Sequence, residues 1–225
     1  MSDTIAEDAS PSAPRGLADR LKHATQRLHR RAERTGFIHD LLTHRGTLAG
    51  YLLFLRNLLP AYEALEAGLE AQAAAGRPLA PLAQPGLYRG AALRADLDHL
   101  AGPGWPTQIP VLEAAEAYAG RVRLAGTQGA GAGLAGHAYV RYLGDLNGGQ
   151  ILARLLARDL ALPEPGLTFY AFPAFPDPHA AAADFRTAID GLAAVPGLDL
   201  AAIEAEAMAS FEASIALSEA VAGCV

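Results

Sequence analysis

The sequence predicts an all-α protein. From Arg15 onward, alanine and leucine recur at spacings of three and four residues, which is typical of helices with one buried face. No run of alternating Val, Ile or Thr predicts a strand. Clusters of proline and glycine at 73–86, 102–106 and 162–178 separate the periodic segments. Together these patterns favour a bundle of helices joined by short connections.

The periodic segments predict eight helices. Their expected boundaries are about 16–34, 36–43, 46–75, 88–101, 109–126, 132–160, 178–194 and 198–221. Residues 1–15 are acidic, rich in Ser and Pro, and lack the apolar stretch of a secretion signal. They are predicted to be a disordered leader.

Composition argues against several classes of protein. Of 225 residues, 51% are hydrophobic and 19% are charged, and each long apolar run is broken by charge or by glycine, which argues against a membrane anchor. The net charge of −6 argues against nucleic-acid binding. A single cysteine, Cys224, excludes an internal disulfide and a multi-cysteine metal site. We therefore expect a cytoplasmic protein with no membrane or nucleic-acid partner.

Four polar residues share one face of the first predicted helix. Lys22, Gln26, His29 and Glu33 follow one another at spacings of three and four residues. This face suits haem, because an imidazole can bind iron, a carboxylate can accept its second N–H, and a cation can reach a propionate. An ordinary solvent-exposed helix with a His–Glu pair explains the same spacing.

The predicted helix 132–160 contains three glycines near its middle. Gly144, Gly148 and Gly149 each cost about 1 kcal/mol relative to alanine inside a helix. Gly144 and Gly148 are four residues apart and lie on one face, which leaves a surface free of side chains. Either another helix crosses there, or a flat ligand lies against the backbone.

These two segments together resemble the haem oxygenase family. The segment "LKHATQRLHRRAE" resembles the proximal helix of that family, and "HAYVRYLGDLNGGQIL" resembles its distal helix. The segments "LPAYEALE", "AEAYAGRVRLAG", "GLTFYAFP" and "EAMASFEASIAL" extend the similarity over residues 16–222. The resemblance implies a single-domain helical bundle over 16–222, with haem between the first helix and a kinked, glycine-rich distal helix.

The resemblance also implies roles for individual residues. His29 would bind the iron, Glu33 would hold its imidazole, Gly144 and Gly148 would flank the distal site, and Asp145 would hold an ordered water there. The residues implied for the distal hydrogen-bond network are Tyr62, Tyr118, Arg141 and Tyr142, and those implied for the propionates are Lys22, Tyr139 and Arg186.

The chain departs from the family pattern at four positions. Gln26 and Ala182 stand where some members carry lysines, so fewer cations would fix the rotation of the haem. The meso carbon that is cleaved is therefore left open. Asn147 replaces a small serine, and Ser214 replaces an asparagine of the distal network.

The implied activity is cleavage of haem by O₂ and electrons to biliverdin, CO and ferrous iron. The sequence carries no flavin, nicotinamide or iron–sulfur fingerprint, so the expected electron donor is a separate ferredoxin or flavoprotein reductase. A bilin acceptor such as a phytochrome would be a further partner. The alternative is a haem-binding storage, transfer or sensor protein without turnover. A non-haem enzyme such as the thiaminase-like family would need a cysteine in the core, whereas Cys224 is near the end of the sequence.

Overall fold

The computed structural model describes residues 16–225, and within them it has ten α-helices and no strand. The helices are α1 (Leu17–Ala32), α2 (Gly36–Leu42), α3 (Leu48–Ala74), α4 (Gly90–Ala101), α5 (Trp105–Gln108), α6 (Glu113–Thr127), α7 (Gly133–Asn147), α8 (Gly149–Asp159), α9 (Pro178–Gly191) and α10 (Leu200–Ala222). The predicted all-α class is confirmed. The predicted leader, residues 1–15, lies outside the described residues.

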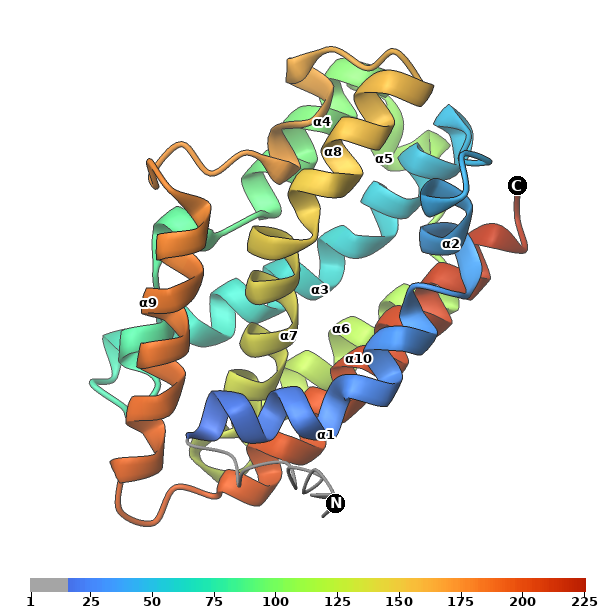
Figure 1. Cartoon of the computed structure of the whole chain (residues 1–225). Coiled ribbons are helices and arrows are strands. Elements are labelled where there is room, and N and C mark those ends of the chain that lie inside the picture. Colours follow the sequence, from blue (N-terminus) through green and yellow to red (C-terminus); the bar gives the residue numbers. More distant parts are fainter. Residues whose placement is uncertain (1–15) are drawn as a thin grey trace, which may run out of the picture.

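The predicted helices differ from the structure at two places. The segment expected to be one helix over 132–160 forms two, α7 and α8, which meet at Gly148 (Figure 1). The Gly148 N–H still donates to the Gly144 carbonyl at 2.8 Å, whereas the Ile151 N–H donates to Gly148 at 3.0 Å and starts a new helix. The short helix α5 lies where a break was expected. Pro106 fits in the first turn of α5, because the first N–H groups of a helix have no partner within the helix and a proline there loses no hydrogen bond.

Helix α7 lies at the centre of the bundle. Twelve of its fifteen residues are buried, so it is packed on nearly every side. In Figure 1, α1 and α10 run side by side, and α7 runs between this pair and α3. Gly136 marks the closest crossing, because a Cβ there would lie 2.4 Å from the Ile203 carbonyl oxygen of α10. A helix crossing therefore explains Gly136.

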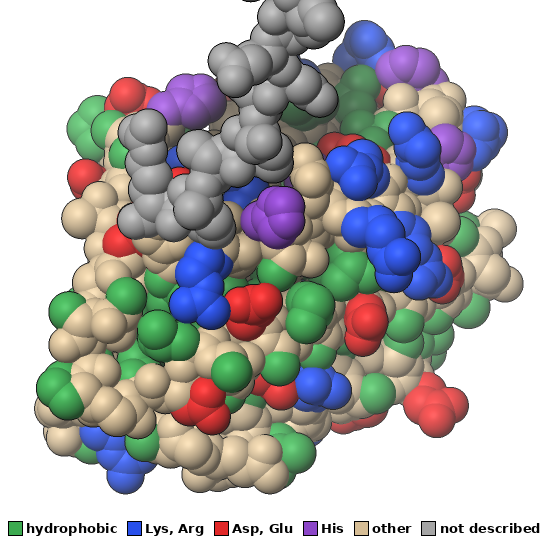
Figure 2. All heavy atoms as spheres, turned by 60° about the horizontal axis from the view of Figure 1, so that its bottom comes forward, with side chains coloured by type: hydrophobic (Ala, Val, Ile, Leu, Met, Phe, Trp, Pro, Cys, Tyr) green, Lys and Arg blue, Asp and Glu red, His purple; other side chains and the backbone are tan. Residues whose placement is uncertain are grey.

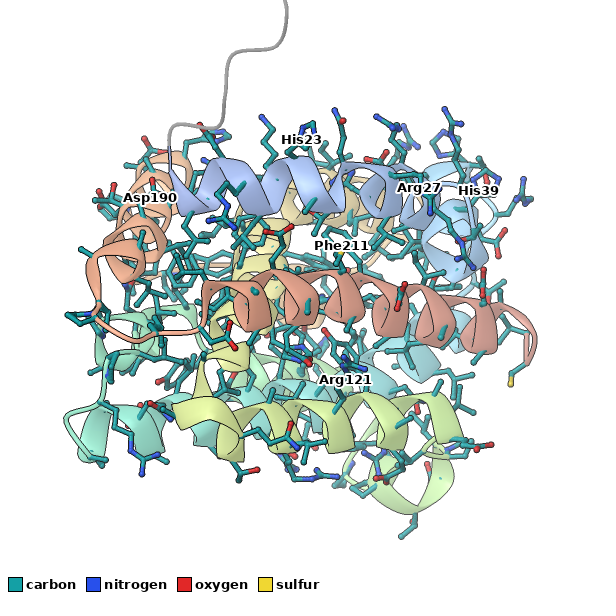
Figure 3. All side chains as sticks on the ribbon, turned by 90° about the horizontal axis from the view of Figure 1, so that it is seen from below. His23, Arg27, His39, Arg121, Asp190 and Phe211 are labelled. Carbon is teal, nitrogen blue, oxygen red and sulfur yellow. The ribbon has the colours of Figure 1, made fainter. Side chains whose placement is uncertain are left out.

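The beginning of α1 is held by another helix. Gly16 provides no side-chain cap, and the Ala18 N–H instead donates to Asp190 of α9 at 2.8 Å. Figure 3 shows Asp190 next to this end of α1. Further along, Arg20 pairs with Glu204 at 3.1 Å, and α10 also pairs with the last turn of α1. Contacts with α9 and α10 thus set the position of α1.

We predict that Asp190→Ala lowers the free energy of unfolding by about 1 kcal/mol, because the first turn of α1 loses its capping carboxylate. Urea unfolding followed by circular dichroism measures this change. The control is Asp184→Ala on the exposed part of α9, where no hydrogen bond or ion pair joins Asp184 to another described residue. Equal losses in the two variants would contradict the capping role.

Candidate functional site

The polar stripe of α1 is exposed to solvent. The side chains of Lys22, Gln26, His29 and Glu33 are all exposed, and His29 Nδ1 lies 3.6 Å from Glu33 Oε1. This distance allows an ion pair but is longer than a hydrogen bond. The His29 ring lies edge-on to Phe211 of α10, with centroids 5.8 Å apart, and Figure 3 shows Phe211 between α1 and α10. Because Nδ1 faces Glu33, Nε2 is the nitrogen left for a ligand.

Helix α1 is basic although the chain is acidic overall. The helix contains five cations and one acidic residue, Asp19, whereas the whole chain has a net charge of −6. The cations are Arg20, Lys22, Arg27, Arg30 and Arg31. Figure 2 shows several Lys and Arg side chains gathered at the upper right of the molecular face, with other basic side chains and the acidic ones scattered over it. This local charge favours a ligand that carries carboxylates.

Gly144 of α7 leaves space that no protein atom fills. Gly144 itself is exposed and a Cβ added to it would meet nothing within 4 Å, whereas the residues on either side, Leu143 and Asp145, are buried. No helix crossing therefore requires this glycine, in contrast to Gly136. Of the two explanations that the sequence left open for Gly144, a ligand against the backbone fits and a helix crossing does not. The residues around it therefore fit a flat ligand such as haem.

A buried hydrogen-bond network lies next to Gly144. The Tyr62 hydroxyl of α3 donates to Asp145 Oδ2 at 2.5 Å, and Arg141 donates to the Tyr62 hydroxyl through Nε at 3.0 Å and Nη2 at 2.9 Å. Arg141 also lies 3.5 Å from Asp145 Oδ1 and donates to Ser214 of α10 at 3.2 Å. Three helices thus hold one carboxyl group, and Ser214 keeps a hydrogen bond to Arg141 at a position where the chain departs from the family pattern.

Tyr118 lies near this network, whereas Tyr142 is not joined to it. The Tyr118 hydroxyl shares a hydrogen bond of 2.7 Å with Ser210, whose carbonyl oxygen accepts from Ser214 at 2.7 Å. The Tyr142 hydroxyl is buried without a hydrogen-bond partner among the described residues, and its ring packs edge-on against Phe185. The distal roles of Tyr118 and Tyr142 stay predictions.

Burial changes the acidity of the network. It raises the pKa of Asp145 above the usual range, although the charge of Arg141, the hydrogen bond from Tyr62 and the charge of Arg89 act in the opposite direction. Burial also raises the pKa of Tyr62 well above its usual value. Arg141 stays charged, because Tyr62 and Asp145 outweigh the effect of burial and raise its pKa. A carboxyl group with a raised pKa keeps its proton to a higher pH than a free carboxyl group, which suits it to hold and release a proton.

The residues predicted to bind propionates come from three helices. Tyr139 of α7 is buried next to Thr25 of α1, and burial raises the pKa of Tyr139 to about 12 although the nearby charge of Arg186 lowers it. The structure therefore brings Tyr139 and Arg186 of α9 close together. No hydrogen bond or ion pair within residues 16–225 joins Lys22 to either of them.

Sequence reasoning missed a second polar group on α7. His137 is fully buried, its Nε2 lies 3.0 Å from Glu206 of α10, and Glu206 also accepts from Arg121 of α6 at 2.9 Å. Figure 3 shows Arg121 between α6 and α10. The available signal was the spacing of four residues between Glu206, Ser210 and Ser214, all of which face α6 or α7.

Comparison with known proteins gives a consistent result. The sequence profile of the family described as "Heme oxygenase" matches residues 15–220. The chain belongs to the haem oxygenase family. It is 34% identical over 211 residues to "Heme oxygenase 1" of Pongo abelii, covering 92% of this chain and 72% of that protein. It is 33% identical over 214 residues to "Heme oxygenase" of Takifugu rubripes, covering 94% and 76%.

Solved haem oxygenase structures share the fold. Haem oxygenase-1 of the cyanobacterium Synechocystis, solved in complex with haem, has a TM-score of 0.84 and 29% identity, with 93% of each chain covered. The haem oxygenase of Leptospira interrogans also has a TM-score of 0.84, with 33% identity over 91% of this chain and 99% of that one. These matches confirm the predicted family, helical fold and function as a haem-degrading enzyme. In the described part of this haem oxygenase, no helix is both long and apolar enough to cross a membrane.

The Glu206 contacts predict a pH effect on the stability of this haem oxygenase. The hydrogen bond with His137 is the main cause that lowers the pKa of Glu206 from 4.5 to about 2, with help from Arg121 and against the effect of burial. A lowered carboxyl pKa stabilises the fold above the unfolded pKa, and this contribution disappears as pH falls toward the folded pKa. We therefore expect the stability difference between the wild type and Glu206→Gln to shrink between pH 5 and pH 2, values taken as about the limits of this titration.

Urea unfolding at several pH values measures this difference. The matched control is Glu212→Gln, also on α10, since Glu212 forms no ion pair within the described residues. A pH-independent difference for Glu206→Gln, or an equal pH effect for both variants, would contradict the assignment.

Proposed function

We propose that this chain binds haem between α1 and α7 and cleaves it to biliverdin, CO and ferrous iron. The observation that carries the proposal is the unfilled space at Gly144 beside the buried Asp145–Tyr62 pair. When bound, haem supplies the iron that activates O₂ and the porphyrin ring that is cleaved.

The binding residues lie on three helices. His29 Nε2 is assigned to the iron, and Glu33 orients the imidazole from the Nδ1 side. Lys22, Tyr139 and Arg186 are assigned to the propionates, because cations and hydroxyl groups are the usual partners of carboxylates. On the opposite side, the backbone at Gly144 and Gly148 would lie against the ring.

The distal residues supply a proton. Tyr62 donates to Oδ2 of Asp145, Arg141 lies 3.5 Å from Oδ1, and the remaining lone pairs of the carboxyl group can hold a water molecule. The raised pKa of Asp145 lets the carboxyl group pass a proton through this water. Tyr118 and Ser214 support the position of the network from behind, whereas Tyr142 is not joined to it. The presence of the buried Asp145–Tyr62 pair, which can hold and release a proton, favours turnover over a storage, transfer or sensor role.

The electrons come from a separate ferredoxin or flavoprotein reductase, and O₂ is the second substrate. A protein that uses biliverdin, such as a phytochrome, is a further partner. We place the reaction in the cytoplasm.

We predict opposite effects of Gly144→Ala on stability and on haem binding. Because the new methyl group meets no protein atom, the haem-free protein gains about 0.5–1 kcal/mol of unfolding free energy from the better helix former. The same methyl group intrudes on the haem surface and weakens haem binding by about tenfold. Urea unfolding and a spectral haem titration measure the two effects.

Gly120→Ala in α6 is the matched control, since a Cβ at Gly120 also meets nothing within 4 Å. It should gain stability and leave haem binding unchanged. If Gly144→Ala binds haem as tightly as the wild type, the haem surface does not include Gly144.

Haem turnover tests the proposed function directly. Purified protein is mixed with haem and then with ascorbate or a ferredoxin and its reductase under air. Loss of the Soret band with growth of a biliverdin band, and CO trapped on a globin, are expected. Asp145→Ala should bind haem but form no bilin, because it loses the group that holds the proton-donating water.

Histidine variants provide the binding control. His29→Ala should change the ferric haem spectrum, whereas His23→Ala, which removes another exposed histidine of α1, should not. A stable ferrous haem complex of the wild type that yields no bilin would reject the oxygenase in favour of a haem carrier.

A further inference from the structure

The segment "GLTFYAFP", singled out in the sequence, folds into a tight turn behind the distal site. Thr168–Tyr170 form a 3₁₀ turn that is held by α4. Asp96 of α4 is fully buried and accepts three hydrogen bonds from the turn, from the Thr168 N–H at 2.8 Å, the Thr168 hydroxyl at 2.5 Å and the Phe169 N–H at 2.8 Å. We call Asp96 and this turn the Asp96 clamp.

Arg89 holds the same turn from the other end. Its buried guanidinium donates from Nη1 to the Ala171 carbonyl at 2.5 Å and lies over the Phe172 ring, 4.1 Å from its centroid. Two buried charged residues therefore fix a connection of only a few residues. Because burying a charge is unfavourable unless it is fully hydrogen-bonded, such an arrangement leaves the turn little freedom.

The Asp96 clamp contacts the distal site at two points. The Phe169 ring packs edge-on against Tyr62, with centroids 5.6 Å apart, and Tyr62 is the donor to Asp145. Tyr170 packs against the bend between α7 and α8, since a Cβ at Gly149 would lie 3.1 Å from its ring. Its carbonyl oxygen also accepts from Gln150 at 2.7 Å.

We propose that the Asp96 clamp is a positioning device for Asp145: through Phe169 it holds Tyr62 against the carboxyl group, and through Tyr170 it fixes the bend that follows Gly148. Asp96, Phe169 and Tyr170 are positioning residues, because none of them reaches Asp145 by a hydrogen bond. The inference rests on the proposed function only for the role of Asp145. The contacts that couple the Asp96 clamp to Asp145 are present in the haem-free protein.

The coupling has a signature that a merely structural turn would lack. The pKa of Asp145 is lowered, against the effect of burial, by Arg141 of α7, by Tyr62 of α3 and, at longer range, by Arg89. The phenol groups of Tyr142 and Tyr170 also lie within electrostatic range of Asp145. A change in the Asp96 clamp that loosens Tyr62 should therefore raise the pKa of Asp145. Arg89 is unsuitable as a test, since its removal also removes a charge.

Phe169→Leu provides the decisive variant, because it changes no charge and keeps the Asp96 hydrogen bonds to the backbone. The pKa of the Asp145 carboxyl is measured by ¹³C NMR in the haem-free full chain. We expect it to rise by about half a unit or more, in the same direction as in Tyr62→Phe, which removes the hydrogen bond outright. Phe54→Leu is the matched control, since Phe54 is buried in an aromatic pair with Phe37 and makes no ring pair with Tyr62.

An unchanged Asp145 pKa in Phe169→Leu, together with a raised one in Tyr62→Phe, would overturn the proposal. So would equal shifts in Phe169→Leu and Phe54→Leu. Haem turnover is not part of this readout. A chain that makes no bilin can still show the coupling, and a chain without the coupling can still make bilin, so the two proposals fail separately.

Hydrogen exchange gives a second measurement at the bend. Asp96→Asn replaces one acceptor oxygen of the clamp by a donor, which should loosen the turn that packs against the bend. The amides of Ile151 and Leu152, which donate to Gly148 at the bend, should then exchange faster than in the wild type. Amides of α6 should be unaffected. Unchanged exchange at Ile151 and Leu152 in the folded Asp96→Asn variant would contradict the second half of the proposal, and Phe169→Leu decides the first half if Asp96→Asn does not fold.

Discussion

The close crossing of α7 and α10 at Gly136 determines where the rest of the site can lie. With a Cβ excluded by the Ile203 carbonyl at 2.4 Å, the two helices approach until their backbones touch. At this separation even short side chains can bridge them. Serines on α10 therefore reach partners on neighbouring helices, and a longer residue at Gly136 would separate the helices and break these contacts together.

The crossing fixes the alignment of a polar seam, the row of polar side chains between α7 and α10. Along α7, His137, Arg141 and Asp145 follow one another every four residues, and Glu206 and Ser214 of α10 face the first two. The seam is costly to bury, and nearly all of its groups have partners. The exception among the α7 residues of this seam is His137 Nδ1, which has no hydrogen-bond partner among the described residues. The last group of the seam, Asp145, is the one that lies beside the unfilled space at Gly144.

Much of the fold could be predicted because helical periodicity is a local signal. The sequence indicated every long helix, and the family resemblance implied a kinked distal helix, although not that the helix would end at Gly148. The short α5 was missed because Trp105 is fixed by contacts outside its own segment, including its indole N–H to Asp98 at 2.7 Å. The prolines and glycines at 102–106 predicted a break in the chain at this place, where α5 begins.

The candidate site was predicted unevenly for a similar reason. Arg141 and Asp145 share one helix, and their spacing of four residues predicted the ion pair. Tyr142 has nearly the same spacing to Asp145, but its hydroxyl faces a different part of the core and has no partner. Ser210 and Tyr118 are 92 residues apart, and Asp96 and Phe169 are 73 apart. Such pairs follow from tertiary packing alone, which no local pattern encodes.

The way α1 is held has a consequence for the order of events during synthesis. This helix is made before α9, which supplies its cap, and before α10, which supplies its ion-pair partners. A sixteen-residue helix with four buried residues is marginal on its own. The position of His29 is therefore not fixed until α9 and α10 have also been made.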